Sequence, residues 1–146
     1  MTLTETTSPG QTTTLSFELE LSHPREKIWR ALTEPRLLSE WLLPIVELRL
    51  EPGAAFEFRA PEQPGWDGLV SCRLLESREG ELLSYRWVAG GIDTVMTFTL
   101  AASASGTRLS IVQSGFNEAQ KQNFGGARYG WKMMTGRLIE LLGRAS

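Results

Sequence analysis

Side chains able to act as nucleophiles or general bases are few and far apart along the chain. The sequence contains one histidine, His23, before the predicted start of a helix, and one cysteine, Cys72, on the inward side of a predicted strand. Nucleophilic catalysis needs a base beside the nucleophile, and a structural zinc site needs several Cys or His ligands. The acidic residues Glu57, Asp67 and Asp93 fall at outward or turn positions, without a spacing that favours general acid–base catalysis. We therefore predict no catalytic residue, no metal and no cofactor.

Apolar and aromatic side chains instead favour the binding of a hydrophobic molecule. They occupy every second position of several segments, which directs them to one face of a sheet. The predicted cavity residues are Trp41, Phe56, Phe58, Tyr85, Trp87, Met96, Phe98, Ile111, Arg128, Trp131, Met134 and Leu138. Rings and thioethers suit a cavity that accepts varied partners, because they demand few hydrogen bonds. The alternative is that these side chains simply fill a solid core.

A few polar side chains are candidates for orienting the polar end of such a ligand. We assign this role first to Arg128, because a guanidinium holds a carboxylate through two parallel hydrogen bonds. Tyr85, Gln113 and Tyr129 are further candidates, and each has a structural or surface role as its alternative. Trp41 is expected either at the mouth of the cavity or as a buried anchor for its helix.

Seven segments show the two-residue periodicity of half-buried strands. They lie at residues 14–21, 46–50, 56–58, 68–76, 82–88, 94–100 and 107–113. Short turns join most of them, which favours antiparallel pairing. Residues 25–35 and 35–41, between the first two strands, are predicted to form two short helices.

The last thirty residues change to a helical spacing. Their apolar positions recur every three or four residues, at Phe124, Ala127, Trp131, Met134, Leu138 and Leu141. Asn117 is a plausible N-cap, and Gly125 and Gly126 predict a bend or a late start. Together with Gly130 they leave the wall of the cavity thin near the start of this helix. The helix there is either a mobile lid that admits a ligand or packs closely against the sheet. We predict an α+β fold in which a seven-stranded curved antiparallel sheet wraps around this long C-terminal helix.

Length and charge limit the classes of partner. The 146 residues have the size of one domain, which we place at 14–146, after a polar N-terminal arm at 1–13 that is expected to be disordered. The net charge of -2 provides no broad positive face for nucleic acid, and no apolar run approaches the roughly 20 residues of a membrane helix. We therefore expect a cytoplasmic protein, monomeric or weakly dimeric, without nucleic-acid binding or membrane insertion.

Five motifs in order resemble one known family. They are HPREKIWRALTEPRLLSEW, EPGAAFEFR, the lone Gly68, SGTRLSIVQSGF and the YGW before the last helix. They are similar to homologues of the activator of the heat-shock protein 90 ATPase, within the START-like (SRPBCC) superfamily that includes the birch pollen allergen. The resemblance runs from about residue 14 to the end and implies a helix-grip fold with an internal cavity, which in many relatives holds a hydrophobic molecule. The separate N-terminal domain with which the eukaryotic activator engages the chaperone has no counterpart in this sequence.

Three functions follow as hypotheses. The first is non-catalytic binding or transport of a small hydrophobic molecule, in which apolar side chains supply affinity and a few polar groups supply orientation. The second is a cyclase-like or hydratase-like enzyme that uses an arginine or tyrosine of the cavity for proton transfer. The third is a chaperone co-factor of the stress response that contacts a chaperone and stimulates its ATPase.

Overall fold

The computed structural model describes residues 2–46, 48–62, 64 and 66–144. In chain order the elements are β1 (Thr2–Glu5), β2 (Thr14–Leu21), α1 (Arg25–Thr33), α2 (Pro35–Trp41), β3 (Ile45–Val46), β4 (Ala55–Arg59), β5 (Leu69–Arg78), β6 (Leu82–Ala89), β7 (Ile92–Ser103), β8 (Gly106–Ser114) and α3 (Lys121–Arg144). The predicted α+β class and the order of the two short helices, the sheet and the long helix are confirmed.

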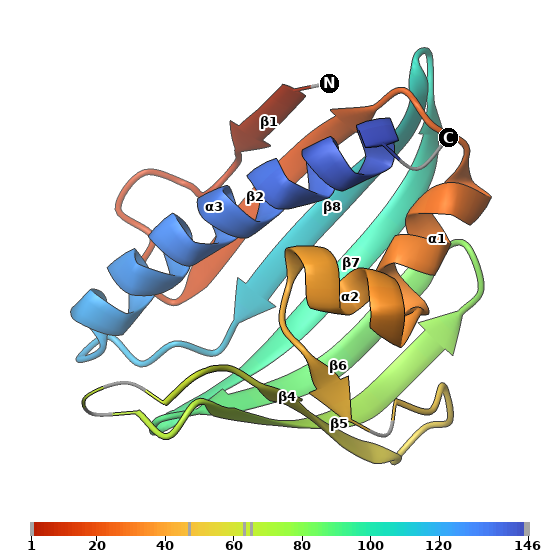
Figure 1. Cartoon of the computed structure of the whole chain (residues 1–146). Helices are drawn as coiled ribbons and strands as arrows, with labels where there is room; N and C mark the ends of the chain where they lie inside the picture. The colour runs from red at the N-terminus through yellow and green to blue at the C-terminus, as the bar shows by residue number, and fades with distance from the viewer. Residues whose placement is uncertain (1, 47, 63, 65, 145–146) are drawn as a thin grey trace.

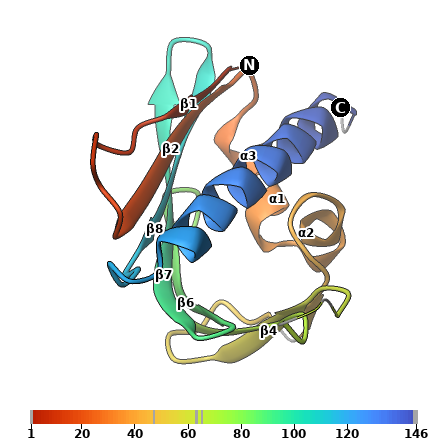
Figure 2. The same cartoon turned by 90° about the vertical axis from the view of Figure 1, so that its left-hand side faces the viewer.

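One antiparallel sheet carries all the described strands, in the order β1-β2-β8-β7-β6-β5-β4-β3. Figure 1 shows α3 crossing the concave side of this sheet, with α1 and α2 beside the second half of the helix. The view in Figure 2 shows the sheet curling from β1 to β4 around the helices. This is the helix-grip arrangement that the resemblance implies. None of the described helices is long and apolar enough to cross a membrane.

The N-terminal segment departs from the prediction of seven strands behind a disordered arm. Thr2–Glu5 forms β1, which pairs with β2 from Thr2 opposite Glu20 to Glu5 opposite Phe17. Four residues with one large apolar side chain, Leu3, are too few for a periodicity to be recognised. Backbone pairing with β2 and the ion pairs of Glu5 stabilise this segment, and neither can be recognised from a hydrophobic pattern.

Two further predicted boundaries are wrong. The strand expected at 46–50 is limited to Ile45–Val46, and Leu50, expected to face inward, is 40% exposed. Glu47 lies outside the described residues. The long helix begins at Lys121 and continues through Gly125 and Gly126 without a break. Ahead of it, the Asn117 N–H donates to Gln120 Oε1 at 2.8 Å, so the predicted cap forms a separate turn.

The inward side chains of the strands form the core, as their alternation predicts. Phe58, Leu83, Met96, Phe98 and Ile111 are each at most 1% exposed. These side chains belong to one core cluster with buried residues of the three helices. Examples are Ile28 of α1, Leu38 of α2, and Trp131, Leu138 and Leu142 of α3. Burying apolar surface at about 25 cal/mol per Å² is the main contribution that holds the helices on the sheet.

Candidate functional site

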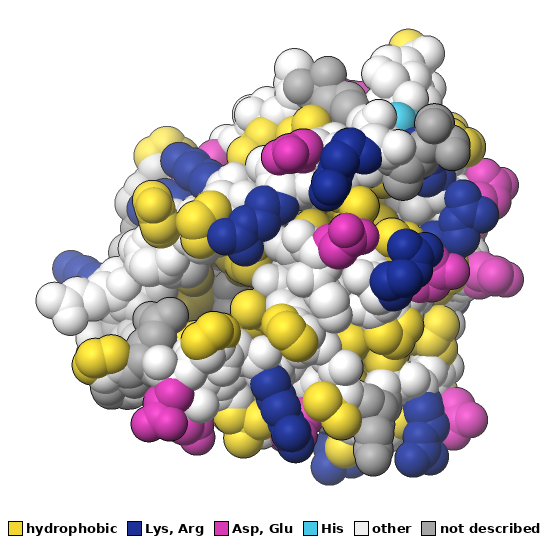
Figure 3. Space-filling model, viewed as in Figure 1, with side chains coloured by type: hydrophobic (Ala, Val, Ile, Leu, Met, Phe, Trp, Pro, Cys, Tyr) yellow, Lys and Arg dark blue, Asp and Glu magenta, His cyan; other side chains and the backbone are white. Residues whose placement is uncertain are grey.

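A cleft of about 530 Å³ lies between the first half of α3 and the sheet. Figure 3 shows it as a hollow on the face viewed, with hydrophobic side chains around it. Its lining residues are Trp66, Val70, Trp87, Ala89, Gly90, Ile92, Gln113, Gln122, Asn123, Gly126, Ala127, Gly130, Trp131 and Met134. Pockets for small molecules span roughly 300–1,000 Å³, so the cleft has the size of a ligand site.

A chain of buried hydrogen bonds joins α3 to the sheet beside the cleft. Trp131 Nε1 donates to Gln113 Oε1 at 2.9 Å, and Gln113 Nε2 donates to Thr94 Oγ1 at 3.0 Å. The Thr94 hydroxyl in turn donates to the carbonyl of Trp87 at 2.9 Å. Buried polar groups are costly unless they are paired, and these are paired with one another. The Gln113 amide therefore fixes the position of the Trp131 ring that lines the cleft.

A loop between β4 and β5 brings Trp66 to the cleft. The loop closes where the Ala60 N–H donates to the Gly68 carbonyl at 2.7 Å. Gly68 has a φ of +83°, and a Cβ there would lie 2.1 Å from the Ala60 oxygen, so only glycine fits. Trp66 Nε1 donates to the Leu69 carbonyl at 3.1 Å, which orients the indole.

The wall formed by α3 is thin because it is built partly from glycine. Gly126 and Gly130 line the cleft, and a Cβ on Gly126 would meet no other atom within 4 Å. The start of α3 is tied to the β6–β7 turn, where Gln120 Nε2 donates to the Gly91 carbonyl at 3.2 Å. This contact holds the two rims of the cleft together at the end where the helix begins.

Aromatic rings fill the space beneath the middle of α3. Tyr85 lies 5.1 Å from Phe56 and 5.9 Å from Phe98, measured between ring centroids. Trp131 lies 6.1 Å from Phe98 and 5.9 Å from Trp87. The predicted internal cavity is therefore occupied here by side chains, and the cleft lies to one side of Trp131.

Groups that could carry chemistry lie outside the cleft. Burial raises the pKa of the Cys72 thiol to about 12, and burial, with Cys72 nearby, raises the pKa of Tyr85 well above its usual value. Both side chains are therefore protonated at neutral pH. Partial burial and the ammonium of Lys27, whose Nζ is 3.1 Å from Nδ1, lower the pKa of His23. None of these three residues lines the cleft.

The sequence matches the family model of the Activator of Hsp90 ATPase homolog 1-like protein over residues 22–143. The chain belongs to this family. The resemblance stated from five motifs is thus confirmed. No curated protein matches the chain.

Solved structures agree with this Hsp90-activator-like assignment. Protein MLL2253 from Mesorhizobium loti is 36% identical, with a TM-score of 0.84 over 91% of this chain and 98% of its own. Protein CV1439 from Chromobacterium violaceum is 30% identical, with a TM-score of 0.73 over 89% of this chain and 97% of its own. DynU16, a protein of the dynemicin biosynthetic locus, is 19% identical, with a TM-score of 0.78 over 91% of this chain and 48% of its own; this likeness shows the fold alone.

The predicted cavity residues separate into two groups in this family member. Trp87, Trp131 and Met134 line the cleft. Eight others are buried in the core and do not line the cleft: Trp41, Phe56, Phe58, Tyr85, Met96, Phe98, Ile111 and Leu138. Arg128 belongs to neither group. Trp41 is the anchor of its helix, because its ring is fully buried and Nε1 donates to the Ala31 carbonyl at 2.8 Å.

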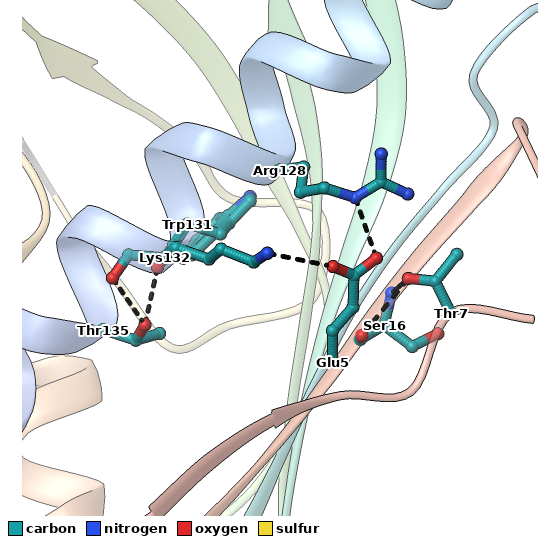
Figure 4. A network of polar contacts seen from close by, with 7 residues as sticks. All are labelled: Glu5, Thr7, Ser16, Arg128, Trp131, Lys132 and Thr135. Carbon is teal, nitrogen blue, oxygen red and sulfur yellow. Dashed lines mark hydrogen bonds and ion pairs between the residues drawn. The ribbon is translucent and has the colours of Figure 1, made fainter.

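Arg128, the residue expected to hold an acidic head group, does not line the cleft. Figure 4 shows its side chain directed to β1, where Nε donates to Glu5 Oε2 at 2.8 Å. Lys132 Nζ lies 3.3 Å from the other oxygen of the same carboxylate. Because β1 was not predicted, the partner that draws Arg128 to this side of the helix could not be recognised from the sequence.

Several residues that line the cleft were not among the predicted cavity residues. Trp66 and Ile92 lie outside the segments whose alternation was used, and Gln122 and Asn123 are polar residues of the first turn of α3. A tryptophan in a loop rich in proline and glycine is a signal that could have indicated Trp66. Gln113, predicted from the sequence as a candidate polar group, does line the cleft, where it continues the inward series of Leu109 and Ile111.

Proposed function

We propose that the protein binds a small hydrophobic molecule in the cleft and does not transform it. The observation that carries the proposal is the lining itself, in which the indoles of Trp66, Trp87 and Trp131 surround a hollow of about 530 Å³. The Gln113 amide, which lines the cleft, already bonds to Trp131 and to Thr94. An apolar ligand would therefore cover apolar surface without leaving these buried groups unpaired.

The expected affinity follows from the area that such a ligand would bury. About 350 Å² of apolar surface at about 25 cal/mol per Å² contributes roughly 9 kcal/mol before the cost of immobilising the ligand. A micromolar dissociation constant corresponds to about 8 kcal/mol. Because the cost of immobilisation lowers the roughly 9 kcal/mol, the dissociation constant is expected to be micromolar or higher.

A cleft-filling substitution tests the proposal. Gly126→Leu places a side chain in the cleft, whereas Gly125→Leu places the same side chain on the preceding helical position, outside the lining. Leucine is a better helix former than glycine by about 0.8 kcal/mol, so both variants are expected to keep the stability of the fold. Titration with the neutral fluorophore N-phenyl-1-naphthylamine should show saturable binding to the parent chain and to Gly125→Leu.

For Gly126→Leu we expect at least a tenfold loss of affinity with an unchanged circular dichroism spectrum. Equal affinity in the parent chain and both leucine variants would place the ligand elsewhere and contradict the proposal.

The family description favours a second candidate, a contact with a chaperone that stimulates its ATPase. Mixing the protein with an Hsp90-type chaperone and measuring phosphate release tests it directly. A rate that rises with the concentration of the protein, in the parent chain and in Gly126→Leu alike, would support this role independently of the cleft. If the rate of phosphate release does not rise, the chaperone role is excluded.

A further inference from the structure

We infer that the cleft selects uncharged molecules with a neutral polar end and rejects amphiphiles with an ionised head group. The inference rests on the proposed function and narrows its ligand class. None of the fourteen described residues that line the cleft carries a charge. An ion moved from water into an apolar site without a partner of opposite charge loses several kcal/mol of hydration energy.

The polar group at the base of the cleft offers no substitute for an ionic partner. Gln113 is 3% exposed, and both ends of its amide are engaged, the oxygen by Trp131 and the nitrogen by Thr94. An anionic head group that reached this point would find a neutral amide and no positive charge to compensate its own. A hydroxyl or carbonyl group would not bring that additional cost of burying a charge.

Two of the cations that neighbour lining residues along α3 are engaged on another side of the helix, whereas Lys121, beside Gln122, is exposed. Arg128 and Lys132 follow the lining residues Ala127 and Trp131 in the chain, yet both bind the carboxylate of Glu5 on β1 (Figure 4). The Arg128 guanidinium also lies 5.1 Å from the centroid of the Phe124 ring. The single carboxylate of Glu5 on β1 thus engages two cations whose neighbours in the chain line the cleft.

The first turn of α3 provides the polar groups of the lining that remain accessible. Gln122 and Asn123 are exposed lining residues, and their amides both donate and accept hydrogen bonds. Such groups suit a hydroxyl or carbonyl at the outer end of a ligand. They provide no countercharge for a carboxylate, phosphate or sulfonate.

Two fluorophores with the same skeleton test the inference. N-Phenyl-1-naphthylamine is uncharged, and 8-anilino-1-naphthalenesulfonate differs from it by one ionised sulfonate. We expect saturable binding of the neutral probe and at least tenfold weaker binding of the sulfonate at the same ionic strength. Equal or tighter binding of the sulfonate would overturn the inference while leaving hydrophobic binding intact. Binding of neither probe would overturn the proposed function and the inference with it.

A second experiment introduces a positive charge into the lining of the cleft. Asn123→Arg places a guanidinium in the lining, and Gly125→Arg places one on the same helix outside it; each changes the net charge from -2 to -1. We expect Asn123→Arg to raise the affinity for the sulfonate at least fivefold, with less than a twofold change for the neutral probe. An equal gain in Gly125→Arg, or no gain in Asn123→Arg, would contradict a cleft whose selectivity comes from its uncharged lining.

Discussion

Gln113 connects three elements through one side chain. From β8 its amide accepts a hydrogen bond from Trp131 on α3 and donates one to Thr94 on β7. Its inward position follows from the alternation of Leu109 and Ile111, so the sequence already indicates a polar group on the dry face. Which partners satisfy the amide depends on residues 18 and 19 positions away in the chain, and strand periodicity carries no information about them.

Replacement of Gln113 by leucine should destabilise the fold. The variant leaves the buried Trp131 N–H without an acceptor, which costs about 1–3 kcal/mol. The free energy of unfolding from urea denaturation measures the effect, and Gln122→Leu at the exposed rim is the matched control, expected within about 0.5 kcal/mol of the parent chain. A Gln113→Leu variant as stable as the parent chain would show that the hydrogen-bonded chain does not hold Trp131.

Among the elements, the strands with strong alternation were predictable and the edge strands were not. β2 and the strands from β5 to β8 form where the two-residue period is long and regular. At the edges, β1 has few apolar residues and β3 has two residues, so pairing with a neighbour decides their structure. Arg128 shows the consequence for the site, because its position on α3 was predictable but the strand that engages it was not.

The attachment of β1 to α3 should depend on pH and salt. Burial raises the pKa of Glu5, but hydrogen bonds from Arg128, Thr7 and Lys132 outweigh this and hold the pKa below its usual value of 4.5. A carboxyl whose pKa is lower in the folded state stabilises the fold above pH 4.5, and this contribution is lost as the pH falls through the lower folded value.

Substitution Glu5→Gln should therefore lower the free energy of unfolding at pH 7 by about 0.5–1 kcal/mol, and by less at 1 M salt. Urea denaturation at both salt concentrations measures this difference. Glu118→Gln, the same change of charge in an exposed turn, is the control. If the two variants lose equal stability, or if the loss is the same at pH 3 and pH 7, the ion pairs of Glu5 do not hold β1 on the helix.

At the scale of the whole molecule, the two halves of α3 are covered by different elements. Beneath the second half of α3 the buried residues of α1 and α2 complete the core, while beside the first half the covering elements are the Trp66 loop and the β6–β7 turn. Sequence patterns predicted the helix-grip fold and which side chains face inward. They could not predict where those side chains leave space, because that depends on how rings from distant strands pack together.

The five tryptophans provide the most direct measurement of the central claim. Each indole N–H gives a separate signal in a ¹H–¹⁵N NMR spectrum, and titration with N-phenyl-1-naphthylamine reports where the probe lies. The account predicts that the signals of Trp66, Trp87 and Trp131, which line the cleft, shift and saturate together. Those of Trp29 and Trp41, which do not line it, should stay in place. Shifts confined to Trp29 and Trp41, or no shift at any indole, would contradict a hydrophobic ligand site between α3 and the sheet.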